Sequence, residues 1–124
     1  MTNITTLIDG YIAAWNETDP QRRRALVDQT FAQDADYLDP LMSGEGAQGI
    51  DAMIAGAQAQ YPGHRFELAT APDAHHDRVR FSWHLVADGG GPIATGHDFA
   101  TLSDDGRLRS VTGFLETAAA PAGD

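Results

Sequence analysis

A chain of 124 residues suits a single domain, and a hydrophobic fraction of 42% is enough for a packed core. The formal net charge is −10 and all eight basic residues are arginines, which argues against nucleic-acid binding and excludes a Schiff-base or P-loop lysine. The chain has no cysteine, so disulfides and cysteine-bound metals are excluded. Neither a secretory signal nor an apolar run of roughly 20 residues is present, and we therefore expect a cytoplasmic protein.

Three helices are predicted in the first half of the chain. Apolar residues recur at helical spacing between residues 4 and 15. Asp19-Pro20 is typical of an N-cap followed by proline at the first position of a second helix. That helix should bury Leu26, Val27 and Phe31, while the arginines at 22–24 fan around its exposed side. A third helix is expected over about residues 47–61.

The remaining pattern predicts an antiparallel meander. Strands are expected at about residues 35–39, 64–71, 77–87, 92–103 and 107–117. Alternation places Val79, Phe81, Trp83 and Leu85 on one face of the third of these strands. We expect one domain over residues 1–117 and a disordered tail at 118–124.

Two hairpins predict which side chains face each other. If Asp105-Gly106 form a two-residue turn, Asp98 lies opposite Gly113. If the loop over residues 88–93 is symmetric, Trp83 lies opposite Asp98, and His84 lies opposite His97. Asp98 then shares one face with Trp83 and Gly113, because opposed residues point the same way.

The opposite face of the sheet is predicted to be the outer one. It should carry Val86, Phe99, Thr112 and Phe114, and such an apolar surface favours a homodimer. His84 and His97 would lie in or near that contact. The histidines supply no evident set of three metal ligands, so no metal site is predicted.

Four stretches carry a resemblance to a known family. They are "YIAAWNETD", "ADYLDP", "GHDFATLSDDGRL" and "VTGFLE". Together with the order of helices and strands, they resemble the SnoaL-like branch of the nuclear-transport-factor-2-like superfamily. The resemblance implies an α+β cone, in which three N-terminal helices pack on a strongly curved, mostly antiparallel sheet that encloses a pocket.

Within that superfamily, the residue pattern is similar to that of ketosteroid isomerase. Tyr11, Asp39 and Asp98 fall on its helix-one tyrosine, its general-base aspartate before a proline, and its protonated aspartate. The resemblance implies that Asp39 abstracts a proton next to a carbonyl, while Tyr11 and neutral Asp98 donate to the developing enolate. Apolar neighbours should raise the pKa of Asp98 and keep it neutral at pH 7.

The same resemblance implies a set of substrate-binding residues and a substrate class. The expected walls are Trp15, Tyr37, Ile54, Phe81, Trp83 and Leu115. The expected ligand is an apolar small molecule that bears a carbonyl, and no cofactor is required. The expected activity is that of an isomerase or a polyketide cyclase.

Structural alternatives stay open for each of the three central residues. Asp39-Pro40 is also typical of a turn in which the aspartate caps the following segment. Tyr11 could be a core residue whose hydroxyl bonds a backbone carbonyl, and Asp98 could be a structural acid. The rival function is therefore a ligand-binding or dimerisation module without catalysis.

Overall fold

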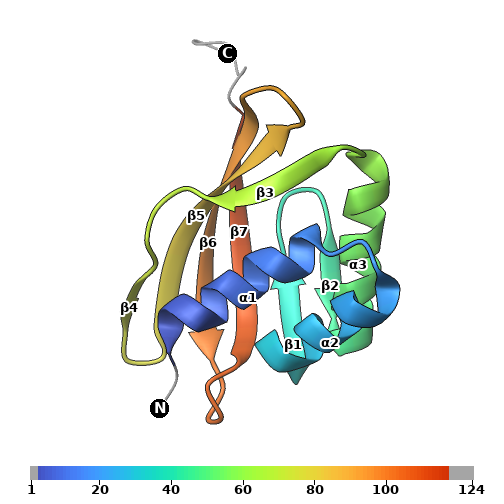
Figure 1. Cartoon of the computed structure of the whole chain (residues 1–124). Coiled ribbons are helices and arrows are strands. Elements are labelled where there is room, and N and C mark those ends of the chain that lie inside the picture. The colour runs from blue at the N-terminus through green and yellow to red at the C-terminus, as the bar shows by residue number, and fades with distance from the viewer. Residues whose placement is uncertain (1–2, 118–124) are drawn as a thin grey trace.

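The computed structural model describes residues 3–117, in which three helices pack on one strongly curved sheet (Figure 1). The helices are α1 (Ile4–Asn16), α2 (Pro20–Thr30) and α3 (Gly46–Gln60). The strands are β1 (Phe31–Leu38), β2 (Ser43–Glu45), β3 (His64–Leu68), β4 (Asp73–His75), β5 (Arg78–Ala87), β6 (Pro92–Leu102) and β7 (Leu108–Thr117).

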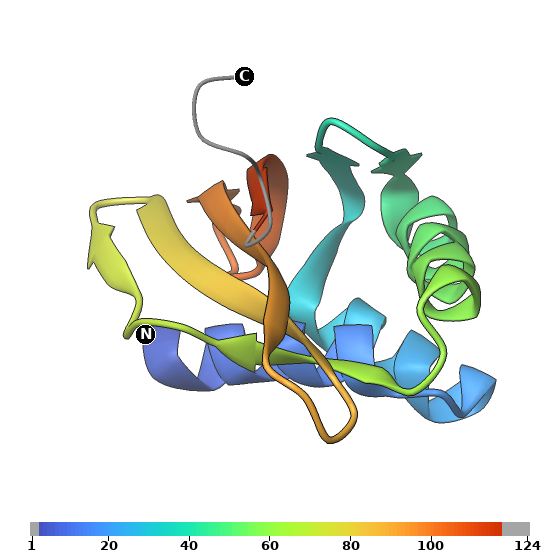
Figure 2. The same ribbon diagram turned by 90° about the horizontal axis from the view of Figure 1, so that it is seen from above.

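The strand order is β2-β1-β7-β6-β5-β3, with β4 paired to β5. Among these strands β1 and β7 run parallel, and the other pairs are antiparallel. Figure 2 shows the sheet curling around one side, which α1 covers. The predicted α+β class with a curved, mostly antiparallel sheet is confirmed. No helix in the described part of the chain is both long and apolar enough to cross a membrane.

The second helix begins as predicted but ends one residue earlier than its apolar pattern indicated. Asp19 accepts a hydrogen bond from the Arg22 backbone N–H at 2.9 Å, and Pro20 occupies the first turn. Phe31 was expected on this helix, yet it is the first residue of β1. Its backbone is extended, with φ −105° and ψ 142°, so the chain passes directly from helix to strand. Phe31 is fully buried, so its inward direction was predicted correctly although it lies on a strand.

The three arginines of α2 do not all face solvent, because consecutive helical residues point about 100° apart. Arg23 is only 7% exposed. Its guanidinium donates to Asp51 at 2.9 Å and to Gln58 at 3.2 Å, which ties α2 to α3. The Gln58 amide in turn donates to the backbone oxygen of Trp15 at 3.0 Å. The prediction of an exposed face was therefore wrong for Arg23.

The hairpin between β6 and β7 has the predicted register but a different turn. A longer loop closes with a bond from the Ser103 N–H to the Arg107 oxygen at 2.7 Å. Gly106 adopts φ +82°, a left-handed conformation that glycine permits. A register shift just after this loop compensates for its length, so Asp98 still lies opposite Gly113.

The hairpin between β5 and β6 differs from the symmetric loop that the sequence suggested. Trp83 lies opposite Gly96, and Phe81 lies opposite Asp98. His84 lies opposite Thr95, so the predicted pairings of Trp83 with Asp98 and of His84 with His97 were wrong. The displacement is two residues, which preserves the face of every side chain. Asp98, Trp83 and Gly113 therefore share the inner face, as predicted.

The inner face of β5 holds the core. Val79, Phe81, Trp83 and Leu85 are all buried, as alternation predicted. Val86 was assigned to the exposed outer face, but it is only 5% exposed. The register shifts between Leu85 and Val86, which breaks the simple alternation there.

Candidate active site

Asp98 is the central polar group on the inner face of the sheet. It lies on β6, is 1% exposed, and one carboxyl oxygen, Oδ2, accepts two hydrogen bonds. The Tyr11 hydroxyl donates at 2.7 Å, and the Trp83 indole N–H donates at 3.0 Å. Trp83 lies against Gly96, where a Cβ atom would stand 2.1 Å from the indole ring. A glycine at position 96 is therefore what lets this indole reach Asp98.

The other oxygen of Asp98, Oδ1, is buried without a hydrogen-bond partner. A Cβ atom on Gly113 would lie 2.8 Å from this oxygen, 3.1 Å from the Asp39 Cβ and 3.5 Å from the Tyr37 hydroxyl. Because Gly113 has no side chain, Asp98, Asp39 and Tyr37 all come close to its backbone, and we call this tightly packed place the Gly113 niche. Two carboxyl groups and one phenol surround this niche.

Asp39 lies just after β1 and is half-buried. Its Oδ1 accepts from the backbone N–H groups of Leu41 and Met42, at 2.8 and 2.9 Å. Its Oδ2 accepts from the Tyr37 hydroxyl at 2.6 Å. Asp39 therefore caps the turn that follows it, as the structural alternative proposed. The same side chain also borders the Gly113 niche, and a lone pair of Oδ2 is left for a further partner.

Burial raises the pKa of Asp98 from 3.8 to about 6, and the negative charge of Asp39 adds to this rise. The hydrogen bonds from Tyr11 and Trp83 act in the opposite direction, because they stabilise the carboxylate. The direction of the shift agrees with the sequence-based expectation. A raised pKa increases the fraction of Asp98 that is neutral near pH 7.

The two tyrosines of the site remain protonated at neutral pH. Burial, followed by the charge of Asp98, raises the pKa of Tyr11 well above its ordinary value. The same two causes raise the pKa of Tyr37. Both phenols therefore act as hydrogen-bond donors, Tyr11 to Asp98 and Tyr37 to Asp39.

Aromatic rings fill the interior around these groups. Trp15 lies 5.6 Å from Tyr37 and 5.2 Å from Phe66, measured between ring centroids. Phe66 lies 5.1 Å from Trp83. The Trp15 indole N–H is buried and has no hydrogen-bond partner. A narrow cleft of about 90 Å³ reaches Trp15 and Phe66 from the surface.

Three further predicted wall residues belong to the hydrophobic core or pack against it. Phe81 packs edge-on against Tyr11, with ring centroids 5.0 Å apart. Ile54 is fully buried in the same hydrophobic cluster, and Leu115 is partly buried against it. Phe66 is a further wall residue that was not predicted, although its alternating strand after the third helix is a signal that could have identified it.

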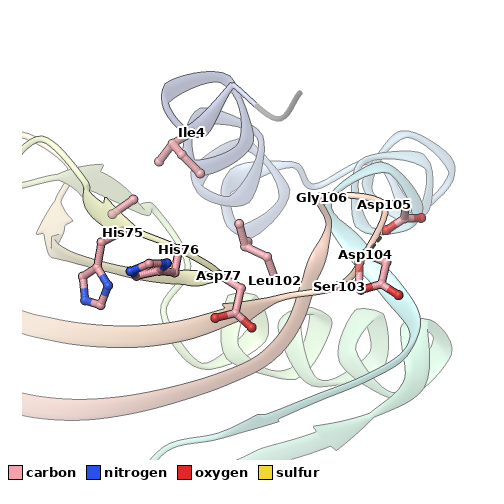
Figure 3. A pocket seen from close by; sticks show the side chains of 10 residues that line it. Ile4, His75, His76, Asp77, Leu102, Ser103, Asp104, Asp105 and Gly106 are labelled. Atoms are coloured by element: carbon pink, nitrogen blue, oxygen red, sulfur yellow. Dashed lines mark hydrogen bonds between the residues drawn. The ribbon is translucent and has the colours of Figure 1, made fainter.

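A larger hollow lies elsewhere, at the end of the sheet near the start of α1 (Figure 3). It has a volume of about 800 Å³ and lies beside β4 and the loop between β6 and β7. His75 and His76 line it, and Asp77 and Asp105 are already paired with arginines. Residues 3–117 contain no group of three or more histidine, aspartate or glutamate side chains suited to a metal ion. This hollow contains none of the predicted site residues.

The histidines of the central strands face outward, as predicted. His97 lies between the Ser82 hydroxyl and the Glu116 carboxylate, with both distances at 2.8 Å. His84 bonds Thr95 at 3.0 Å. His97 and Asp98 are neighbours in sequence but point to opposite faces, so they do not form a catalytic pair.

The comparisons with known proteins agree with this fold. Residues 8–111 match the model of the SnoaL-like domain, and the chain belongs to this family. A crystal structure of a candidate isomerase of the SnoaL-like family from Agrobacterium tumefaciens is 49% identical. The match covers 94% of this chain and 99% of that one, with a TM-score of 0.88.

Two more distant structures share the fold. A candidate polyketide cyclase from Sinorhizobium meliloti is 21% identical over 87% of this chain and 93% of its own, with a TM-score of 0.68. A candidate SnoaL-like polyketide cyclase from Jannaschia is 15% identical over 98% of both chains, also with a TM-score of 0.68. No curated protein matches this chain.

Proposed function

We propose that the protein is a cofactor-independent proton-transfer enzyme, an isomerase or a cyclase, acting on an apolar small molecule that bears a carbonyl. The observation that carries the proposal is the Gly113 niche. It presents an unpartnered oxygen of buried Asp98 on one side and Asp39 on the other. Buried polar atoms are rarely left without partners, and a protonated Oδ1 could donate to a ligand oxygen.

In this proposal the substrate oxygen lies in the niche beside Asp98. Oδ2 already accepts from Tyr11 and Trp83, so a proton on Asp98 resides on Oδ1 and points at that oxygen. An apolar ligand that excludes water disfavours the carboxylate further and increases the neutral fraction. Neutral Asp98 then donates a hydrogen bond to the substrate oxygen while negative charge develops there.

Asp39 is the proposed general base. It takes the proton from the carbon next to the carbonyl, and the electron pair of the broken C–H bond moves into the enolate. An isomerase would return the proton to another carbon, whereas a cyclase would let the enolate carbon attack a second carbonyl. Tyr37 donates to Asp39 at 2.6 Å and holds its carboxylate in place.

Tyr11 has a different proposed role from the one that the resemblance implied. Its hydroxyl is directed at Asp98, so it positions that carboxyl and does not contact substrate directly. Trp83 acts in the same way from β5. The Trp15 N–H has no partner and is available to a second polar atom of the ligand.

A methyl group at Gly113 would already meet Asp98 at 2.8 Å, so the side chains around it must shift to admit the substrate oxygen, and the apolar body of the ligand must lie outside the niche. A hollow of about 740 Å³ lies between α3 and the turn after β1. Leu41, Met42, Met53 and Tyr61 are among its lining residues. Asp39 holds the backbone of Leu41 and Met42, so the proposed base is next to this hollow.

The family supports the proposal, since a SnoaL-like relative at 49% identity carries the name of a candidate isomerase. The test is a panel of unsaturated ketones and polyketide-like esters incubated with the protein in heavy water. Exchange of the acidic C–H hydrogens, followed by mass spectrometry, is expected for at least one compound. Saturable binding without any exchange would support the rival, a ligand-binding module.

A further inference from the structure

Among the buried side-chain nitrogen and oxygen atoms of residues 3–117, two have no hydrogen-bond partner. They are Oδ1 of Asp98 and Nε1 of Trp15. The two side chains are 1% and 6% exposed. Folded proteins seldom leave buried polar groups unpaired, because such a group loses its bonds to water without a replacement. One ligand that bonds both atoms would account for both exceptions.

The two atoms belong to one connected group of side chains. Tyr11, one turn before Trp15 on α1, donates to Asp98 Oδ2 at 2.7 Å. Burial raises the pKa of Tyr11, and the Trp15 N–H opposes this rise, because a donor near the phenol oxygen stabilises its charged form. The Trp15 N–H therefore faces the Tyr11 hydroxyl, although no hydrogen bond joins them. The Tyr37 ring centroid lies 5.6 Å from that of Trp15, and the Tyr37 hydroxyl borders the Gly113 niche.

A ligand body next to the proposed base is also next to Trp15. The cleft of about 90 Å³ reaches Trp15 from the surface. Ala57 and Tyr61 line this cleft, and they also line the hollow of about 740 Å³ beside Leu41 and Met42. The cleft and the hollow therefore adjoin, so one molecule can extend from the hollow toward both unpartnered atoms.

The hydrogen-bonding capacity of the two atoms restricts the ligand. An indole N–H can only donate, whereas Oδ1 donates when Asp98 is neutral and accepts when it is ionised. With a pKa of about 6, Asp98 can adopt both states near neutral pH. The keto form of a 1,3-dicarbonyl compound offers two acceptors, and its enol form offers one donor and one acceptor. Such a compound therefore matches both states, while a single carbonyl leaves one of the two atoms unpaired.

We propose that the substrate is a 1,3-dicarbonyl compound, with one oxygen at Asp98 Oδ1 and the other accepting from the Trp15 N–H. This inference rests on the proposed function, in which Asp39 is the base. The C–H bond between the two carbonyls breaks, its proton goes to Asp39, and its electron pair spreads over both oxygens of the enolate. Such a C–H is more acidic than that of a simple ketone, which suits a carboxylate base. Trp15 is then a specificity-determining residue.

The test compares two probes with the same carbon skeleton, 1-phenylbutane-1,3-dione and 1-phenylbutan-1-one, by isothermal titration calorimetry. Wild type is expected to bind the dione at least about tenfold more tightly, because a buried donor gains a partner. Trp15→Phe removes the N–H and should reduce this preference to less than about threefold. Phe66→Leu is the matched control, since it trims a ring that packs on Trp15 but removes no donor, and the preference should persist.

A second measurement needs no variant. The chain has two tryptophans, so a proton–nitrogen NMR spectrum contains two indole N–H signals. The dione should move the Trp15 signal downfield through the new hydrogen bond, and the monoketone should move it less. Equal affinity of wild type for the two probes, no measurable binding of the dione, a preference that survives Trp15→Phe, or an unmoved Trp15 signal would each overturn the inference.

This inference and the proposed function can fail separately. A preference for the dione in a protein that exchanges no C–H hydrogen would refute the proton-transfer function and leave the role of Trp15 standing. Exchange of a monoketone by a protein without that preference would refute the role of Trp15 alone.

Discussion

Replacing Asp98 by asparagine should stabilise the protein at neutral pH. The folded protein holds the pKa of Asp98 at about 6, raised from 3.8 mainly by burial. Between about pH 4 and pH 6 the folded state therefore binds a proton that the unfolded state releases. The contribution of Asp98 to the free energy of unfolding must fall as the pH rises through this window, and this contribution is flat above it. At pH 7 this shift lowers the free energy of unfolding of wild type by about 3 kcal/mol, compared with a pH at which Asp98 is protonated in both states.

Asparagine keeps an oxygen for Tyr11 and Trp83 and removes the charge. Asp98→Asn should therefore be more stable than wild type at pH 7, by up to about 3 kcal/mol, and the advantage should vanish near pH 4. Urea unfolding of both proteins at pH 4, 5, 6 and 7 measures the difference, and exposed Asp9→Asn serves as the control. An asparagine variant that is less stable at pH 7, or a difference that does not change with pH, would refute the reasoning.

The remaining predictions concern the neighbours of Asp98. Tyr11→Phe removes a donor to the carboxylate, so the pKa of Asp98 should rise further, as a carbon-13 NMR titration of the carboxyl would show. A pKa that stays the same would remove Tyr11 from its positioning role. Gly113→Ala places a Cβ 2.8 Å from Asp98, which should cost about 1–3 kcal/mol of stability in urea unfolding and close the niche to ligands. Gly56→Ala, in open space on α3, should instead stabilise by about 0.5–1 kcal/mol, and equal effects of the two alanines would contradict the packing described around Gly113.

The faces of the sheet could be predicted from the sequence because side chains alternate along a strand. An error of two residues in the β5–β6 register left Asp98, Trp83 and Gly113 on the inner face. Alternation along the strand decides which face of the sheet a side chain lies on. The length of the connecting loop decides which residue of the next strand lies opposite. That is why the pairing of Trp83 with Asp98 was wrong although their shared face was right.

The polar contacts of the site could not be predicted in the same way. Trp83 was expected to be an apolar neighbour, but its N–H bonds Asp98 because Gly96 makes room for the indole. Tyr37 was expected as a wall, and it also donates to Asp39. Both contacts depend on side-chain directions that packing determines. The buried place of Arg23 is of the same kind, since its partners lie on a different helix.

The central claim, that Asp39 abstracts a proton from a ligand held in the Gly113 niche, is tested most directly by C–H exchange in heavy water. Wild type and Asp39→Asn are compared on the same carbonyl compound at concentrations that saturate both proteins. Loss of a general base lowers rates on the order of a hundred- to ten-thousand-fold, while the asparagine retains the shape of the side chain. We predict exchange by wild type and a loss of that size in Asp39→Asn, with binding preserved. Exchange that continues unchanged in Asp39→Asn would contradict the role of Asp39.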